Sequence, residues 1–134
     1  MSIFFNRVLR GNPQDPAAPK KFYPVLKTVQ RITEKEVAKQ IADETTLNPK
    51  EAEMAISQLQ KVLVRNLLDS KSVQLGDWGT FNLTANCLPS DTKEGATANN
   101  ISKLNIRFRP GKDLKNELAK ATFIPAENIV TGLI

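Results

Sequence analysis

The residues in this sequence that are best suited to bind a ligand are cations in its last third. In LNIRFRPGK, residues 104–112, Arg107 and Arg109 alternate with apolar residues, and Lys112 follows a Pro-Gly pair. Successive side chains of a strand point to opposite faces, so the alternation predicts a strand that holds both guanidinium groups on one face. Lys112 would begin a helix, where free backbone N–H groups, with that of Gly111, suit a bound anion.

A second stretch, VQLGDWGTFNLT at residues 73–84, has the same alternation but is interrupted by GDWG. Glycine tolerates backbone angles that other residues avoid, so the interruption predicts a turn or bulge between two strands. After it, Phe81 and Leu83 should face the core. Thr80 and Asn82 should then face outward. If this strand pairs with the arginine-bearing one, the outward faces form one surface of hydroxyl, amide and guanidinium groups.

The reactive side chains of the sequence argue against catalysis. Its 134 residues include no histidine and one cysteine, Cys87, which leaves no imidazole base and no cysteine cluster for a metal. The acidic residues stand mostly among lysines on helical patterns, where solvated ion pairs are the simplest interpretation. No nucleophile with a base and no phosphate-binding glycine loop is present. The sequence therefore predicts no enzyme activity, no cofactor, no metal and no small-molecule substrate.

The net charge of +5 is concentrated at one end of the chain. Residues 1–32 contain six basic residues and one acidic residue, whereas the remainder contains 13 of each sign. A basic segment beside a neutral body favours an anionic partner, nucleic acid first and a membrane surface second. A basic tail that serves only solubility is the alternative.

The first 31 residues read as an extension of low helical tendency. Ile3–Leu9 and Tyr23–Val29 are apolar enough for strands, and four prolines lie in the connector between residues 13 and 24. Proline removes a donor and fixes φ, so this connector is expected to be a loop, and the two runs could form a hairpin.

Two helices are predicted next. TEKE, residues 33–36, has the form of a capping box, and the helix that it starts should end near Thr45. Asn48 and Pro49 then form a second start, followed by a helix of about 20 residues with a wide apolar stripe. A DNA-reading helix-turn-helix is disfavoured because this second helix is long and aliphatic and carries few basic residues, Lys61 and Arg65.

The rest of the chain consists of a polar segment, a short helix and an apolar tail. Residues 86–102 are small and polar and could be a long hairpin, and KDLKNELAKA at 112–121 predicts a helix with Leu114, Leu118 and Ala121 inward. The last thirteen residues are largely apolar. No apolar run approaches the roughly 18 residues of a membrane span, and the N-terminus does not resemble a secretory signal. With a single cysteine, this predicts a cytoplasmic protein without a membrane partner.

Taken together, these motifs resemble the HU and integration host factor family of bacterial histone-like DNA-binding proteins. VQLGDWGTFNLT is similar to the family's signature after its second helix, and RFRPGKDLKNEL is similar to its closing strand and helix. The likeness covers residues 32–121, between an N-terminal extension (1–31) like that of a longer HU-like subgroup and an apolar tail (122–134). The resemblance implies an α+β fold: two helices, a curved antiparallel sheet with a long β-arm, and a short last helix, in an intertwined homodimer.

The resemblance also implies a function, which is non-sequence-specific binding of double-stranded DNA by a nucleoid-associated protein through a concave β-saddle. The candidate DNA-binding residues are Thr80, Asn82, Lys93, Lys103, Arg107, Arg109, Gly111, Lys112 and Lys115. The sequence departs from the family at the arm tip, expected near residues 94–96, because the usual proline wedge is missing there. The arm also sums to one negative charge. These departures leave DNA bending open and keep an alternative, an HU-fold protein-interaction module that has lost DNA binding.

Overall fold

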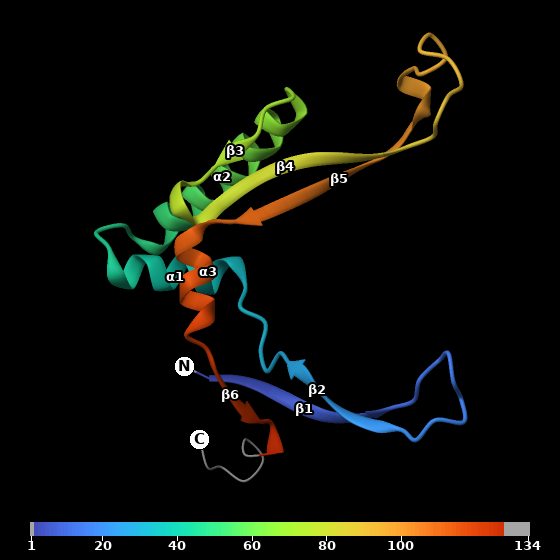
Figure 1. Ribbon diagram of the computed structural model, residues 1–134. Coiled ribbons are helices and arrows are strands. Elements are labelled where there is room, and N and C mark those ends of the chain that lie inside the picture. Colours follow the sequence, from blue (N-terminus) through green and yellow to red (C-terminus); the bar gives the residue numbers. More distant parts are fainter. Residues whose placement is uncertain (1, 128–134) are drawn as a thin grey trace. The chain divides into compact units, whose positions relative to one another are not determined.

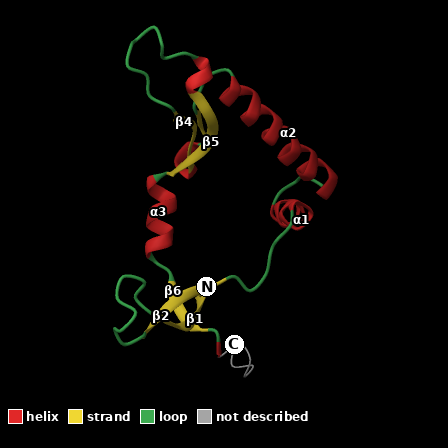
Figure 2. Cartoon of the chain, turned by 90° about the vertical axis from the view of Figure 1, so that its right-hand side faces the viewer, coloured by secondary structure: helices red, strands yellow, loops and turns green. Residues whose placement is uncertain are grey.

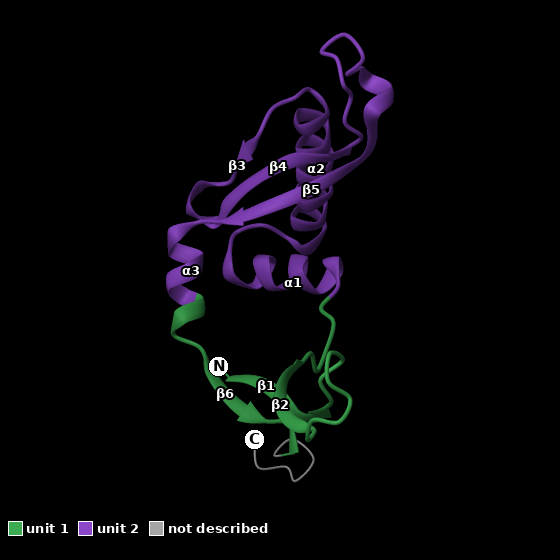
Figure 3. Cartoon of the chain, turned by 45° about the vertical axis from the view of Figure 1, so that its right-hand side comes forward, with its two compact units in different colours: residues 1–32, 118–134 green, residues 33–117 purple. Residues whose placement is uncertain are grey.

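The computed structural model describes residues 2–127 and divides the chain into two compact units (Figure 3). The central unit comprises residues 33–117. The terminal unit comprises residues 1–32 and 118–134, of which 2–32 and 118–127 are described. Figures 1 and 2 show the elements that make up each unit.

Two helices begin the central unit, α1 (Glu34–Glu44) and α2 (Pro49–Leu68). The predicted start of α2 is confirmed, because the Asn48 side chain accepts a hydrogen bond from the Glu51 N–H at 2.9 Å and Pro49 occupies the first turn. Asn48 Nδ2 also donates to Glu51 Oε1 at 2.6 Å. The Asn48 side chain thereby satisfies one orphan N–H of the first turn and also binds the Glu51 carboxylate.

The start of α1 differs from the prediction. Thr33 is the N-cap, but its hydroxyl donates to the Glu36 carboxylate at 3.3 Å, and no side chain caps a backbone N–H there. The reciprocal capping box therefore does not form, since the two side chains bind each other rather than the backbone. The end of α1 is as predicted, with Thr45 as C-cap and its hydroxyl donating to the Ile41 carbonyl at 2.7 Å.

The packing of α1 on α2 is close but supplies little core. Ala38 and Ala52 are each only 1% exposed, and Ser57 Oγ donates to Glu34 Oε1 across the pair at 3.0 Å. Among the described residues no large side chain is fully buried. A body of this kind leaves most of its apolar side chains in contact with solvent, which is costly unless another surface covers them.

The sheet of the central unit contains β3 (Val73–Gln74), β4 (Gly79–Cys87) and β5 (Ile101–Pro110), in the order β3-β4-β5 with antiparallel pairing. β3 pairs only with Thr80 and Phe81. The remainder of β4 has β5 as its partner, so the two strands continue as a two-stranded ribbon (Figure 1).

The GDWG stretch forms the predicted turn, as a 3₁₀ helix at Gly76–Trp78. The Gly111 N–H donates to the Trp78 carbonyl at 2.9 Å and ties the end of β5 to this turn. A Cβ at Gly111 would overlap the Asp77 carbonyl, and one at Gly79 would overlap the Phe108 ring. These two glycines are therefore required by the close approach of backbone to backbone and of backbone to an aromatic ring.

The turn is filled by three aromatic rings. Trp78 meets Phe81 edge to face at 5.8 Å between ring centroids, and Phe108 lies 5.5 Å from Trp78 and 4.8 Å from Phe81. Such pairs stabilise a packing arrangement beyond the area that they bury. The strand bends at GDWG because the glycines let these rings close over the turn.

The segment between β4 and β5 folds upon itself. It contains a 3₁₀ helix, Ala98–Asn100, and Asn100 closes its base by accepting from the Leu88 N–H at 2.7 Å and donating to the Leu88 carbonyl at 3.1 Å. Within it, the Gly95 N–H donates to the Thr92 hydroxyl at 3.0 Å. The predicted polar hairpin connection is thus a closed loop rather than an extension of the two strands.

The last helix, α3 (Lys112–Ala119), is shorter than predicted. It stops before Ala121, whose N–H donates to the Leu118 carbonyl in a closing turn. The prediction that Leu118 points inward is wrong, since this side chain is 60% exposed. The predicted end of the helix lies beyond Ala119 because helix boundaries are poorly determined by the helical period. Leu118 lies inside the helix, but its side chain remains exposed.

The terminal unit is a three-stranded sheet of β1 (Ser2–Arg10), β2 (Lys21–Lys27) and β6 (Thr122–Pro125), in the order β2-β1-β6. β1 and β2 pair antiparallel, so the two N-terminal runs form a hairpin. β6 pairs parallel with β1, and the Ala126 N–H continues the ladder to the Phe5 carbonyl at 2.8 Å. The apolar tail of the sequence analysis therefore begins as a strand, and its residues 128–134 lie outside the described residues.

Candidate nucleic-acid interface

The ribbon of β4 and β5 gathers most of the predicted binding residues on one face. Its register pairs Thr80 with Arg109, Asn82 with Arg107, Thr84 with Asn105, and Asn86 with Lys103. Because paired residues share a face, these eight side chains form one continuous polar surface. We call this surface the polar ribbon face. It includes three cations and no carboxylate.

The opposite face of the ribbon is apolar. Here the pairs are Phe81 with Phe108, Leu83 with Ile106, and Ala85 with Leu104. The alternation read from the sequence thus separates the two kinds of side chain completely along the paired strands. A slip of one residue in register would exchange the faces, so the aromatic packing at Phe81 and Phe108 also determines where the arginines lie.

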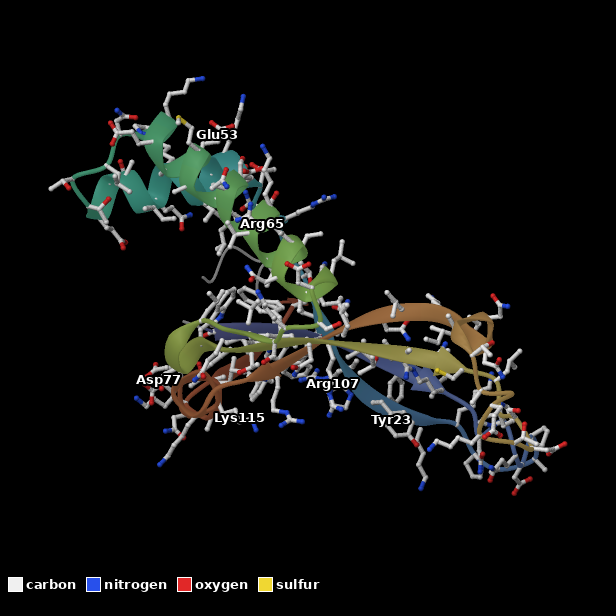
Figure 4. All side chains as sticks on the ribbon, turned by 90° about the horizontal axis from the view of Figure 1, so that it is seen from above. Tyr23, Glu53, Arg65, Asp77, Arg107 and Lys115 are labelled. Atoms are coloured by element: carbon white, nitrogen blue, oxygen red, sulfur yellow. The ribbon has the colours of Figure 1, made fainter. Side chains whose placement is uncertain are left out.

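The cations of the polar ribbon face are available to a ligand. Arg107, Arg109 and Lys103 are exposed, and none has a salt bridge within the part of the chain that the structure describes. Arg107 and Arg109 are two residues apart on the same strand face, so their Cα atoms are about 7 Å apart. In Figure 4, Arg107 and Lys115 lie on one side of the ribbon, and α2, the helix with the labelled Glu53 and Arg65, lies on the other.

The polar partners of these cations are in part less exposed and hydrogen-bonded to each other. Thr80 and Asn82 are half-buried, and further along the ribbon Asn105 Nδ2 donates to Asn86 Oδ1 at 3.1 Å. The Ser102 hydroxyl donates to the Asn86 carbonyl at 2.9 Å where the register shifts. Hydroxyl and amide groups fixed in this way can hydrogen-bond to a sugar–phosphate backbone without reading a base.

The start of α3 carries Lys112 and Lys115, both exposed, but one prediction there is wrong. The Gly111 N–H is not open to an anion, because it donates to the Trp78 carbonyl, while the Gly111 carbonyl accepts from the Lys115 N–H at 3.1 Å. Gly111 therefore has a structural role as the N-cap residue of the helix. The orphan amides at this end are those within the first turn, from Lys112 onward.

Sequence reasoning missed a pair of carboxylates at the same place. The negative charge of Asp77, followed by a hydrogen bond between the two side chains, raises the pKa of Asp113 above its ordinary value. Asp113 stands in the first turn of α3 and Asp77 in the GDWG turn, and the Gly111–Trp78 hydrogen bond brings the two turns together. This negative charge opposes an anion beside Lys112, and only the tertiary contact reveals it.

Lys93 is the predicted binding residue that lies neither on the polar ribbon face nor at the start of α3. It lies in the closed loop between β4 and β5, where its carbonyl accepts from the Ala96 N–H at 3.3 Å. Asp91 and Glu94 flank it in the same loop. The loop thus has little net charge with which to attract DNA.

Metal-binding clusters and membrane-spanning helices are two further features that would bear on the class of site. Within residues 2–127 no three histidine, cysteine, aspartate or glutamate side chains are grouped so that they could hold a metal ion. Among the same residues, no helix combines the length and apolar character needed to cross a bilayer.

The fold of the chain is that of HU-like proteins. A protein of Bacteroides vulgatus ATCC 8482 described as a bacterial DNA-binding protein matches 93% of this chain with a TM-score of 0.64 at 14% identity. This chain spans only 48% of that protein's length. The HU protein of Anabaena, solved with DNA, matches 66% of this chain and 98% of its own, with a TM-score of 0.52 at 13% identity. No curated protein matches the sequence.

The family itself follows from the sequence profile of HU-HIG, described as an HU domain fused to a wHTH, Ig or glycine-rich motif, which matches residues 1–125. The chain belongs to the HU-HIG family. The predicted membership of an HU-like family is thereby confirmed, and the match extends over both units rather than over the central unit alone.

Proposed function

We propose that this protein binds double-stranded DNA without sequence specificity, as a homodimer, through the polar ribbon face. The observation that carries the proposal is the register that sets Lys103, Arg107 and Arg109 in one carboxylate-free row. Lys112 and Lys115 continue the positive charge beyond the strand. Phosphates are the natural ligands of such a row, because guanidinium and ammonium groups bind them with charge-assisted hydrogen bonds.

The membership of the HU-HIG family and the likeness to an HU protein solved with DNA support this proposal. The polar ribbon face presents no cluster of arginine, asparagine or glutamine shaped for base edges in the major groove, so we expect contacts to the backbone and weak discrimination between sequences. Non-specific binding of this kind corresponds to a role as a nucleoid-associated protein.

The dimer is proposed from the apolar surface that a single chain leaves in solvent. Met54 on α2 is 71% exposed and Ile106 on the ribbon is 62% exposed. A second copy that covered α2 and the apolar ribbon face would supply the core that the central unit lacks. Two copies also double the number of phosphates that one complex can engage.

The ribbon would act as the DNA-embracing arm, but sharp kinking is not part of the proposal. A kink needs an apolar wedge between base pairs. The closed loop at the ribbon's end has no proline at residues 94–96, and Pro89 lies close to its base. We therefore expect binding without intercalation.

The test is a titration of duplex DNA against salt with Arg107→Glu, Arg109→Glu. Four cations in each of two copies, Lys103, Arg107, Arg109 and Lys112, would contribute about −7 to the slope of log affinity against log salt. The double variant should lose more than about a hundredfold in affinity at 0.1 M salt with unchanged circular dichroism. The matched control, Lys50→Glu with Lys71→Glu, makes the same charge change elsewhere in the central unit.

Binding that the Arg107 and Arg109 changes leave intact, or an overall slope shallower than about −2, would contradict the proposal. The second candidate is a protein-interaction module of HU fold. It is favoured by one observation, that the central unit has no net charge, with twelve basic and twelve acidic residues between positions 33 and 117. In that case neither variant pair would change DNA binding, and the exposed apolar surface would be the functional one.

A further inference from the structure

The net charge of the protein resides entirely in the terminal unit. Seven basic residues and two acidic ones give this unit +5, which equals the net charge of the whole chain. The central unit, which carries the polar ribbon face, is neutral. Since long-range attraction to DNA depends on net positive charge, most of that attraction must arise outside the ribbon.

The strand register places three cations of the terminal unit on one side of its hairpin. Arg10 pairs with Lys21, Val8 with Tyr23, and Phe4 with Lys27. Arg10, Lys21, Tyr23 and Lys27 therefore share one face, which we call the basic hairpin face. The opposite face carries apolar side chains, among them Phe5, Phe22, Leu26 and Phe123.

The basic hairpin face is open to a ligand. A cleft of about 450 Å³ at the hairpin's end is lined by Arg10, Lys21 and Tyr23 together with Gly11, Pro13 and Pro19 of the connecting loop. The Tyr23 side chain, labelled in Figure 4, is 46% exposed. Arg10, Lys21 and Lys27 have no ion pair within the described residues.

The acidic residues of the terminal unit do not neutralise this face. Asp15 in the connecting loop accepts a hydrogen bond from the Ala17 N–H at 3.2 Å and stabilises a turn. Glu127 pairs with Arg7 at 3.4 Å, and Arg7 lies on the apolar side of the hairpin because it is paired with Pro24. Three of the unit's other cations, Arg10, Lys21 and Lys27, lie together on the basic hairpin face.

We propose that the basic hairpin face is a second DNA-binding surface, which binds the sugar–phosphate backbone of a duplex and supplies long-range attraction that the neutral central unit lacks. Lys21 and Lys27 are six residues apart on β2, about 20 Å, which is about six base pairs of a duplex at 3.4 Å each. Arg10 and Lys21 provide donors for two neighbouring phosphates, and the Tyr23 ring packs against sugar. This inference rests on the proposed function.

DNA is chosen over a membrane because this inference rests on the proposed function, since an amphipathic sheet on an anionic bilayer would also bring its cations to the lipid headgroups. An anionic rod that approaches the basic side meets all three cations at once. Anionic vesicles therefore serve as the competing ligand in the test.

The experiment measures the affinity of the full chain for a fluorescent 30-base-pair duplex at several salt concentrations. Arg10→Gln with Lys21→Gln removes two phosphate contacts per chain. For each chain that engages the duplex, the slope of log affinity against log salt should become shallower by about 1.8, and the affinity at 0.1 M salt should fall about sixtyfold. The control, Arg7→Gln with Arg31→Gln, removes the same charge from the same unit but not from the basic hairpin face.

The proposal is overturned if variant and control lose affinity equally, which would mean diffuse charge rather than a surface. It is also overturned if Arg10→Gln with Lys21→Gln leaves DNA affinity unchanged but abolishes binding to phosphatidylserine vesicles. Failure of the proposed function is a separate result. In that case Arg107→Glu with Arg109→Glu has no effect on DNA binding, whatever the hairpin variant does.

Discussion

In the sheets of both units the register separates side chains onto two faces, but the two units differ in net charge. In β4 and β5 the cations stand in a row within a unit that is neutral as a whole, whereas in β1 and β2 they stand within a unit of net charge +5. The comparison shows that a positive face and a positive unit are separate properties. A positive face is fixed by strand register and acts at contact distance. A positive unit attracts DNA over a distance of about a Debye length.

The two units also differ in how closely their turns are packed. The GDWG turn is closed by three aromatic rings and by a backbone hydrogen bond from Gly111, whereas the hairpin loop is exposed and is held by local hydrogen bonds of Asn12 and Asp15. The central unit should therefore tolerate small changes poorly, and the terminal unit should tolerate them well. The following experiments test that difference, in decreasing order of effect.

The largest effect is expected from Gly111→Ala. The added Cβ would overlap the Asp77 carbonyl, and the backbone must move to relieve it, at a cost of about 3 kcal/mol in the free energy of unfolding. Urea unfolding followed by the fluorescence of Trp78, the single tryptophan, reports on the central unit. The control is Gly11→Ala in the hairpin loop, where the added Cβ meets only the Lys20 side chain at 3.7 Å.

Gly11→Ala should change the stability by less than about 0.5 kcal/mol. Equal destabilisation by both substitutions would show that the two turns are equally constrained, which contradicts the comparison.

A smaller difference is expected between two asparagines that make the same bond. Asn48 accepts from the Glu51 N–H and Asn12 accepts from the Gln14 N–H, each at 2.9 Å. Asn48→Ala removes a helix cap and should cost about 1 kcal/mol, whereas Asn12→Ala opens an exposed turn and should cost less than about 0.5 kcal/mol. Thermal unfolding by circular dichroism at 222 nm measures the first directly. A larger loss for Asn12→Ala would reverse the order that we expect.

The carboxylate pair at the start of α3 predicts a modest dependence on pH. Because Asp77 raises the pKa of Asp113, the folded state holds that proton to higher pH than the unfolded state. Stability should therefore fall as pH rises from the unfolded value of 3.8 through the raised folded value. Asp113→Asn should remove this component and raise DNA affinity about two- to fivefold near neutral pH, because a charge beside Lys112 is lost.

Carbon-detected NMR titration of the Asp113 carboxyl group checks the pKa, with Asp77→Asn as the control that should return it toward its ordinary value. A pKa of Asp113 that does not change in Asp77→Asn would exclude this carboxylate repulsion as the cause.

The smallest effect is expected at the Arg7–Glu127 ion pair. Both side chains are more than half exposed, and the two charged groups lie 3.4 Å apart. A double-mutant cycle with Arg7→Gln and Glu127→Gln should yield a coupling below about 0.5 kcal/mol, and less at high salt. A coupling above about 1 kcal/mol would mean that the terminal sheet depends on this pair and is less tolerant than we propose.

The local parts of this fold could be predicted from the sequence because their signals are local. Asn48 followed by Pro49 marks a helix start wherever it occurs, and the alternation around Phe81 and Arg107 determines both faces of the ribbon once the strands pair. The GDWG turn was predicted from its glycines. Candidate residues on the polar ribbon face followed from the same alternation.

What sequence reasoning missed depends on distant contacts. The run TFIP at residues 122–125 is only four residues long and shows no clear alternation of polar and apolar residues, so it does not predict a strand that pairs with β1. The loss of the Gly111 amide and the repulsion between Asp77 and Asp113 arise only when two separate turns meet. The concentration of charge was visible early, but the placement of three cations on one hairpin face required the register.

The parallel pairing of β6 with β1 joins partners 120 positions apart in the chain, with the whole central unit between them. Bringing such distant segments together in an otherwise unfolded chain costs about 4 kcal/mol of closure entropy. We therefore expect β6 to pair with β1 last during refolding, after the helices and ribbon between them have folded and shortened the distance between the two segments. Until then the edge of β1 is unpaired, so newly made chains are most prone to strand-mediated self-association in that interval, which light scattering during refolding would detect.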